Sequence, residues 1–232
     1  MTWIVTGASR GLGRHLALLL AERGHDVLAC ARDLPRLHAL AQQGAAGRIT
    51  PCQLDLADSA TLGPTLASAV QTMPHISGVI NNAGIGWYKP FSEHTQAELM
   101  ATVQVNLMAV MQVCHLLVPR LVAQGRGHIV NIGSDLARRP LANMAAYVAS
   151  KHGLAGFSHS LLREVKQHGV KVSLVNPGII DTDFGGASEG SRDAAWSLRP
   201  AHLAQLVLQL IEQPGNLLVD ELTVHPLGQG EF

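Results

Sequence analysis

A tyrosine and a lysine lie four residues apart in the stretch Tyr147-Val-Ala-Ser-Lys151. On a helix the two side chains share one face, with Cβ atoms about 5–6 Å apart. A free phenol loses its proton near pH 10, and an adjacent cation lowers that pKa by about 1–3 units. Such a tyrosine would exchange a proton near neutral pH, and the upstream Ser134 has a hydroxyl able to hold a carbonyl oxygen. The same spacing also occurs on helices with an exposed tyrosine and a solvated lysine. Other features of the sequence must therefore decide between a catalytic pair and a surface pair.

A glycine-rich turn near the N-terminus joins an apolar strand to an apolar helix. Residues 2–6 (TWIVT) predict a buried strand, which GASRGLG and the helical pattern RHLALLLAERG follow. Gly7 permits a tight turn, Gly11 lets the backbone approach a pyrophosphate, and Gly13 lets the helix pack on the strand. Free N–H groups and the positive dipole end of the helix favour phosphate. We therefore predict a dinucleotide site, which also includes Ser9, Arg10 and Leu12. The alternative is a glycine-rich connection that binds no dinucleotide.

The second predicted strand, residues 26–31, bears on the choice of dinucleotide. In such folds an acidic residue after this strand binds the 2′-hydroxyl of NAD, whereas an arginine suits the 2′-phosphate of NADP. Arg32 follows the strand, and Arg10 lies in the glycine turn. Because a guanidinium matches phosphate geometry, we favour NADP(H). NAD(H) remains possible through Asp33, and a plain surface role is the alternative for Arg32.

The third predicted strand, residues 48–54, ends at Asp55 and Leu56, where ligands gather in parallel sheets. Asp55 is predicted to accept a hydrogen bond from the adenine amino group, or alternatively to cap nearby backbone amides. Asp58 is the predicted N-cap of the next helix, which runs through Met73.

Strand and helix patterns alternate along the rest of the chain. This order predicts an α/β fold: a single doubly wound Rossmann-type domain over residues 1–232, with a parallel seven-stranded sheet and helices on both faces. The Gly/Ser-rich segment 183–198 is predicted to be a substrate lid within it. The remaining predicted strands are 76–81, 128–132, 170–176 and 217–224, and the helices are 34–43, 95–124 (starting with a Thr95/Glu98 capping box), 145–168 and 200–212.

Composition excludes several other classes. Lysine plus arginine equals aspartate plus glutamate at 17 each, so no nucleic acid or anionic membrane is expected as a partner. No apolar run is expected to reach the ~18 residues of a membrane span, and no secretory signal is expected at the N-terminus. The three cysteines stand singly, and none of the 12 histidines has a metal-ligand spacing. We expect a cytoplasmic protein without a metal site.

The segment Asn81-Asn82-Ala83-Gly84 ends the fourth predicted strand. Together with the glycine turn and with Ser134, Tyr147 and Lys151, it resembles the short-chain dehydrogenase/reductase family over nearly the whole chain. Tyr147 lies 13 positions after Ser134, as is usual in that family. The resemblance implies that the segment 81–84 lines the cofactor groove. It also implies cofactor contacts for Tyr147, Lys151, Pro177, Gly178, Ile180 and Thr182.

The resemblance implies hydride transfer between NADP(H) and a small or medium carbonyl or alcohol substrate. Tyr147 would be the general acid/base, Lys151 would lower its pKa and bind the nicotinamide ribose, and Ser134 would position the oxygen. Asn106 would hold a water in a proton relay to Lys151; a satisfied structural asparagine is the alternative, because an unpartnered buried amide is costly. A homodimer or homotetramer through 95–124 and 145–168 is implied. The rival function is an NADP(H) sensor without turnover.

Several features depart from the family pattern. Asp135 follows Ser134 where a small residue is common, and Arg138 and Arg139 stand near the expected pocket mouth. These charges either favour a polar or anionic substrate or are merely solvated. The tail HPLGQGEF lacks an Asp-Gly-Gly ending. Three aromatic side chains in the loop after Gly84 either wall the pocket or pack beneath the loop: Trp87, Tyr88 and Phe91.

Overall fold

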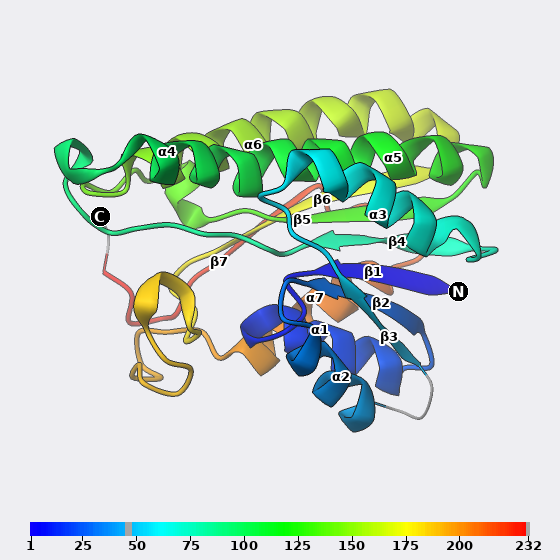
Figure 1. The fold of residues 1–232 in the computed structure, drawn as a ribbon, viewed down its shortest axis with the longest axis horizontal. Coiled ribbons are helices and arrows are strands. Elements are labelled where there is room, and N and C mark those ends of the chain that lie inside the picture. The colour runs from blue at the N-terminus through cyan, green and yellow to red at the C-terminus, as the bar shows by residue number, and fades with distance from the viewer. Residues whose placement is uncertain (45–47, 231–232) are drawn as a thin grey trace.

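Seven parallel strands form one sheet in the computed structural model, which describes residues 1–44 and 48–230 (Figure 1). The strand order is β3-β2-β1-β4-β5-β6-β7. The predicted doubly wound α/β fold is thus confirmed. The strands are β1 (Thr2–Thr6), β2 (Asp26–Ala31), β3 (Ile49–Gln53), β4 (Ile76–Asn81), β5 (Gly127–Ile132), β6 (Val170–Pro177) and β7 (Glu221–Val224).

Helices cover both faces of the sheet. On one face lie α1 (Gly11–Glu22), α2 (Leu34–Gln43) and α7 (Pro200–Ile211), and on the other lie α3 (Ser59–Gln71), α4 (Gln96–Val103), α5 (Ala109–Ala123) and α6 (Ala145–Val165) (Figure 1). Each face has its own cluster of buried apolar side chains. This double covering explains the strand sequences, because strands buried on both faces read as continuous apolar runs.

The strand order reverses beside β1, which pairs with β2 on one side and with β4 on the other. The chain winds outward from β1 to β3, then returns to add β4 next to β1. At such a switch point the connections after the two strands turn away from each other, and a crevice opens at their carboxyl ends. The glycine turn and the segment after β4 lie at this point.

Helix starts agree with the sequence signals. The Asp58 side chain accepts hydrogen bonds from Ala60 N (3.1 Å) and Thr61 N (3.2 Å), as predicted for an N-cap. Thr95 and Glu98 form both bonds of the predicted capping box. These local contacts satisfy N–H groups that the first helical turn leaves without partners.

The helix predicted over 95–124 is interrupted. A π-turn, Gln104–Met108, separates α4 from α5, and it contains the buried Asn106. The helical run Gln96–Ala123 is nevertheless long and apolar enough to cross a membrane by length and composition alone, contrary to our expectation from the sequence. Here it packs against α3, α6 and β4 as a core helix of the fold.

The C-terminal strand is shorter than predicted, beginning at Glu221 instead of Leu217. Side chains of β6 donate hydrogen bonds to the backbone carbonyl groups that precede β7. Lys171 Nζ donates to Leu217 O (2.6 Å), and Ser173 Oγ donates to Val219 O (2.5 Å). These groups are therefore satisfied without a β-ladder. The other predicted bounds differ by a few residues, and α6 ends in a 3₁₀ turn, Lys166–His168.

The close approach of α1 to the glycine turn gives a testable prediction. A Cβ on Gly13 would clash with the carbonyl oxygen of Gly7 and lie 2.5 Å from Asn82 Nδ2. We expect Gly13→Ala to lower the free energy of unfolding by about 1–3 kcal/mol, the usual cost of overpacking, in chemical denaturation. As a control, Gly215→Ala in the exposed connection before β7 meets open space and should change that free energy by less than about 0.5 kcal/mol. Equal stability of Gly13→Ala and wild type would contradict this account.

Candidate active site

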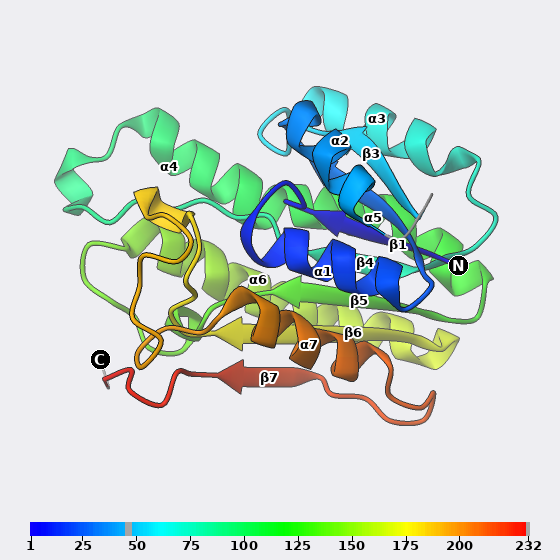
Figure 2. The ribbon, with the colours of Figure 1, turned by 90° about the horizontal axis from the view of Figure 1, so that it is seen from below.

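A cleft of about 1000 Å³ opens at the carboxyl ends of the strands. Figure 2 shows the connections after β4 and β6 gathered at this end of the sheet. The cleft brings together all the predicted cofactor and catalytic residues except Gly13, Asn81 and Asn106. Its lining includes Gly7, Ser9, Arg10, Gly11, Leu12, Arg32, Asp55, Leu56, Asn82, Ala83, Gly84, Ser134, Tyr147, Lys151, Pro177, Gly178, Ile180 and Thr182.

The glycine turn has the geometry of a phosphate cradle. Gly7 and Gly11 have φ values of 67° and 51°, which favour glycine. A Cβ on Gly7 would lie 2.9 Å from Ala83 Cα, and one on Gly11 would lie 3.1 Å from Thr182 Cγ2. The α1 N-terminus has neither a side-chain cap nor an acidic residue in its first turn. Its N–H groups therefore suit the phosphates of a dinucleotide.

Two side chains join the ends of β1 and β4 behind this cradle. Thr6 Oγ1 accepts hydrogen bonds from Asn82 N (3.0 Å) and Ala83 N (3.2 Å). Asn82 Nδ2 in turn donates to Thr6 O (3.0 Å). The positions of the glycine turn and of the segment 81–84 are thereby coupled.

The residues that would distinguish NADP from NAD have different surroundings. Arg32 is exposed on the cleft wall. Asp33 caps α2 through a hydrogen bond from Arg36 N (3.0 Å) and pairs with the Arg36 guanidinium (3.2 Å). Asp55 accepts from Ala57 N (2.9 Å), which is the amide-capping alternative, although it also lines the cleft. Arg10 lies 3.6 Å from the Asp183 carboxylate.

The stretch of α6 with Tyr147 and Lys151 faces the end of β5. Lys151 is buried, and its Nζ donates to Ile132 O (2.7 Å) and lies 5.7 Å from the centre of the Tyr147 ring. Ser134 follows β5, where its N–H donates to Asn176 Oδ1 (3.2 Å). The segment 81–84 lies beside this group, because a Cβ on Gly84 would be in van der Waals contact with Lys151 Nζ (3.8 Å). The sequence did not single out Asn176, which stands near the carboxyl end of β6.

Burial dominates the acid–base properties of the pair. It raises the pKa of Tyr147 to about 12, an effect that a hydrogen bond with Ser134 opposes and the charge of Asp135 reinforces. Burial also lowers the pKa of Lys151 to about 8. The prediction that Lys151 lowers the pKa of Tyr147 is therefore wrong for the protein without cofactor. The phenol keeps its proton, which is the form a general acid requires.

Asn106 ties the loop after β4 to α6. Its Oδ1 accepts from Ile85 N (2.9 Å), and its Nδ2 donates to Ile85 O (2.8 Å) and to Ser150 Oγ (3.0 Å). Ser150 Oγ donates to Tyr147 O (2.7 Å). This satisfied amide matches the structural alternative, and the relay through a water stays a prediction. The π-turn that contains Asn106 is a feature often found at functional sites.

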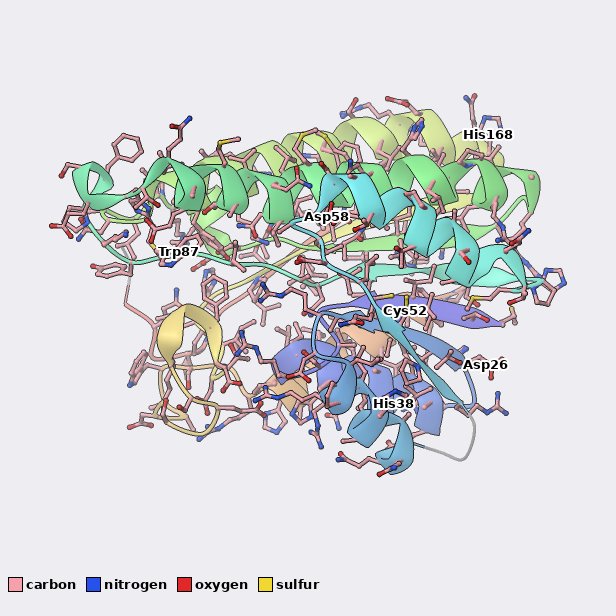
Figure 3. The ribbon with its side chains drawn as sticks, in the orientation of Figure 1. Asp26, His38, Cys52, Asp58, Trp87 and His168 are labelled. Atoms are coloured by element: carbon pink, nitrogen blue, oxygen red, sulfur yellow. The ribbon has the colours of Figure 1, made fainter. Side chains whose placement is uncertain are left out.

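Aromatic side chains form part of the wall next to Tyr147. Trp87 and Tyr88 line the cleft, whereas Phe91 is exposed beside His94. Figure 3 places Trp87 at the end of the molecule where the strands finish, with Asp26 and His168 at the opposite end. Phe184 also packs edge-on to Tyr147, with ring centres 5.5 Å apart. The sequence did not single out Phe184, because only the tertiary structure brings it to the tyrosine.

Arginines near the site are not arranged as expected. Arg138 is exposed and pairs with Glu221 (2.7 Å), and neither it nor Arg139 is among the residues that line the cleft. The proposal that these two select an anionic substrate is therefore not supported. Arg192, from the 183–198 segment, lines the cleft instead.

The 183–198 segment is anchored by Asp181, a buried residue that sequence reasoning missed. Asp181 pairs with Arg199 and accepts hydrogen bonds from Gly190 N (3.0 Å) and Arg192 N (3.1 Å). An acidic residue just after β6 and an arginine just before α7 were the available signal. A further contact joins the segment to α1, because Glu189 lies 3.1 Å from His15 Nε2. Within residues 1–44 and 48–230, no group of three or more His, Cys, Asp or Glu side chains is placed to hold a metal ion.

Comparison with known proteins identifies the family. The family model described as short chain dehydrogenase matches residues 1–192. Carbonyl reductase family member 4 of Xenopus tropicalis is 33% identical over 93% of this chain and 94% of its own length. An uncharacterized oxidoreductase of Staphylococcus epidermidis is 29% identical over 97% of this chain and 96% of its own length.

Similar solved structures indicate the same family. A metagenomic short-chain oxidoreductase in complex with NADP has a TM-score of 0.85 and 33% identity, covering 97% of both chains. An alcohol dehydrogenase from the archaeon Thermococcus sibiricus, complexed with 5-hydroxy-NADP, has a TM-score of 0.92 and 25% identity, covering 99% of this chain and 97% of its own. The chain belongs to the short-chain dehydrogenase family and is an oxidoreductase that uses a nicotinamide cofactor.

Proposed function

We propose that this protein interconverts a carbonyl and an alcohol on a small or medium substrate with NADP(H), and that Tyr147 is its general acid/base. The observation that carries the proposal is that Ser134, Tyr147 and Lys151 line the same cleft as the glycine turn and the Pro177-Gly178 segment. The carbonyl reductase and alcohol dehydrogenase names of similar proteins support it. The aromatic and apolar wall near Tyr147 suits an uncharged substrate body.

The protein groups would act as follows. When bound, the nicotinamide cofactor supplies or accepts the hydride. Tyr147, kept protonated by burial, donates its proton to the carbonyl oxygen in reduction and takes it back in oxidation. Lys151 presents a cation to the nicotinamide ribose, and Ser134 contacts the substrate oxygen. Gly7, Gly11 and the α1 N-terminus hold the pyrophosphate.

The preference for NADP(H) rests on the surroundings of three side chains. Arg32 stands exposed on the cleft wall, where a guanidinium can meet a 2′-phosphate. Asp33, the rival that would bind the 2′-hydroxyl of NAD, is engaged as the cap of α2 and as the partner of Arg36. The NADP in the metagenomic relative adds support.

We propose one domain over residues 1–232, with 183–198 as the substrate lid, assembled as a homodimer or homotetramer through α4–α5 and α6. Met100, Val103 and Met108 are large apolar side chains exposed along α4 and the π-turn, which supports such an interface. In light scattering at micromolar concentration we expect the mass of two or four chains, and a monomer would contradict the proposal. A cytoplasmic location is proposed because the three cysteines are buried and free.

Removing the phenol oxygen tests the catalytic role. We expect Tyr147→Phe to reduce turnover of carbonyl compounds by NADPH roughly 10²- to 10⁴-fold, which is the usual contribution of proton transfer by a positioned side chain. NADPH binding, followed by fluorescence titration, should change little, which shows that the cleft is intact. Near-normal turnover in this variant would reject Tyr147 as the acid. Tight NADPH binding by wild type with no turnover of any carbonyl tested would favour the sensor alternative.

Titration with NADPH and NADH tests the cofactor choice. We expect Arg32→Ala to weaken NADPH binding about 10- to 100-fold, the worth of a charged hydrogen bond to phosphate, and to leave NADH binding unchanged. Arg126→Ala is the charge-matched control, because Arg126 is exposed and does not line the cleft. Equal affinity of wild type for both cofactors would overturn the NADP preference.

A further inference from the structure

Asp135 is a buried carboxylate beside the catalytic serine, and the proposed reaction gives it no role. It is 4% exposed. Its Oδ1 accepts a hydrogen bond from Ser134 Oγ (3.2 Å), and its Oδ2 accepts one from Gln229 Nε2 (2.7 Å). His225 Nε2 lies 3.3 Å from the same Oδ2. Asp135 thus connects the serine to the C-terminal segment.

The hydrogen bonds around Asp135 can run in only one direction. Ile179 N–H donates to Gln229 Oε1 (2.9 Å), which leaves the Nε2 end of that amide to face Asp135 as a donor. An ionised carboxylate has only acceptors, so Ser134 must also donate to it. The order is set at one end by a backbone N–H, which cannot reverse. Gly178, next to Ile179, lacks a Cβ where the Gln229 amide packs.

This order determines what Ser134 offers to the cleft. A serine hydroxyl has one proton, and here that proton is directed to Asp135. The Ser134 oxygen already accepts from Leu136 N (3.2 Å), and its remaining lone pair is its only free site. In this state Ser134 is an acceptor toward Tyr147. It presents a lone pair to the phenol and offers no donor to a phenolate.

We propose that Asp135 is a positioning residue that holds the Ser134 hydroxyl as an acceptor, and that Gln229 is a second positioning residue that aligns Asp135 with the Ile179 backbone. The proposal deepens the carbonyl–alcohol function above and rests on it. It makes the segment from His225 to Gln229 a working part of the active site. The expected consequence is that Tyr147 remains protonated, the form needed for carbonyl reduction.

Charged groups around Asp135 are consistent with this role. His225, whose side chain is 29% exposed, lies against Oδ2, and α6 contributes Tyr147 and Lys151. The Arg138 side chain turns away to Glu221, which also lies 3.1 Å from His159. The negative charge of Asp135 opposes ionisation of Tyr147. Asp135 also holds the Ser134 proton, whose bond to the phenol oxygen would otherwise lower the pKa of Tyr147, so both effects of Asp135 favour the phenol.

The substitution Asp135→Asn removes the charge and reverses the hydrogen bond with Ser134, with little change in the shape of the side chain. An asparagine whose oxygen accepts from Gln229 must turn its NH₂ toward Ser134. Ser134 then accepts that bond, and its own proton becomes free to stabilise a phenolate. If the asparagine turned the other way, its NH₂ would face the Gln229 NH₂. We therefore expect the pKa of Tyr147 to fall.

The pKa change can be measured without any substrate. The chain has two tyrosines, Tyr88 and Tyr147, so tyrosine labelled with ¹³C at Cζ gives two NMR signals, which Tyr88→Phe assigns. Between pH 9 and 11 we expect the wild-type Tyr147 signal to remain that of a phenol. In Asp135→Asn it should begin to titrate, with a pKa lower by about one unit. The control is Asp220→Asn, an exposed aspartate that does not line the cleft.

A double-mutant cycle separates positioning from simple charge. If Asp135 acts partly through the serine, Asp135→Asn should shift the pKa of Tyr147 less in a Ser134→Ala background than in wild type. Equal shifts in both backgrounds would overturn the positioning of Ser134. No shift in either, or the same result as Asp220→Asn, would overturn the role of Asp135 altogether.

Gln229→Ala tests the second residue and applies even if Asp135→Asn fails to fold. Loss of the Ile179 N–H acceptor should weaken NADPH binding about three- to tenfold and lower kcat, whereas Gln213→Ala, just after α7 and outside the cleft lining, should change neither. Identical behaviour of the two variants would overturn the role of Gln229. Absence of turnover in wild type would reject the proposed function, but the NMR titration would still decide the inference about Asp135.

Discussion

The cofactor cleft depends on the close packing of the backbone where α1, the glycine turn and the end of β4 meet. Gly13 leaves no room for a Cβ against Gly7 O, and Thr6 and Asn82 exchange hydrogen bonds across the gap between β1 and β4. These contacts keep the crevice at the switch point at one width and direct the uncapped α1 N-terminus into it. The cofactor cradle, and hence the position of every group that faces it, depends on this packing.

Buried amides at the carboxyl ends of the central strands connect the sheet to α6, which carries Tyr147 and Lys151. Asn81 Nδ2 donates to Asn131 Oδ1 (2.8 Å), and Asn131 Nδ2 donates to Ser158 Oγ (2.8 Å) on α6. Asn176 holds the Ser134 backbone in the same way on the next strand. Because unpaired buried amides are costly, these bonds set the register of α6 against the sheet, and the positions of Tyr147 and Lys151 follow.

The parts of the site that sequence patterns could predict are those encoded within short stretches. The turn from Gly7 to Gly13, the caps at Asp58 and Thr95, and the four-residue spacing of Tyr147 and Lys151 each depend on a few adjacent residues and a known element geometry. Residues such as Phe184 and Gln229 could not be found in this way. Their partners stand 37 and 94 positions away in the chain, at Tyr147 and Asp135, and only the fold brings each pair together.

The sequence by itself therefore determined the strand and helix order, the doubly wound sheet and the residue types at its carboxyl edge, because periodicity, glycine turns and helix caps act locally. Only the tertiary structure decided the chemical state of those residues. The spacing of Tyr147 and Lys151 predicts a lowered phenol pKa, yet burial raises it to about 12. The π-turn at Asn106 likewise could not be predicted, because its stretch has the sequence pattern of a regular helix and Asn106 is bonded to the distant loop after β4. Desolvation and hydrogen-bond direction depend on every group that packs around a side chain, and most of those groups are distant in sequence.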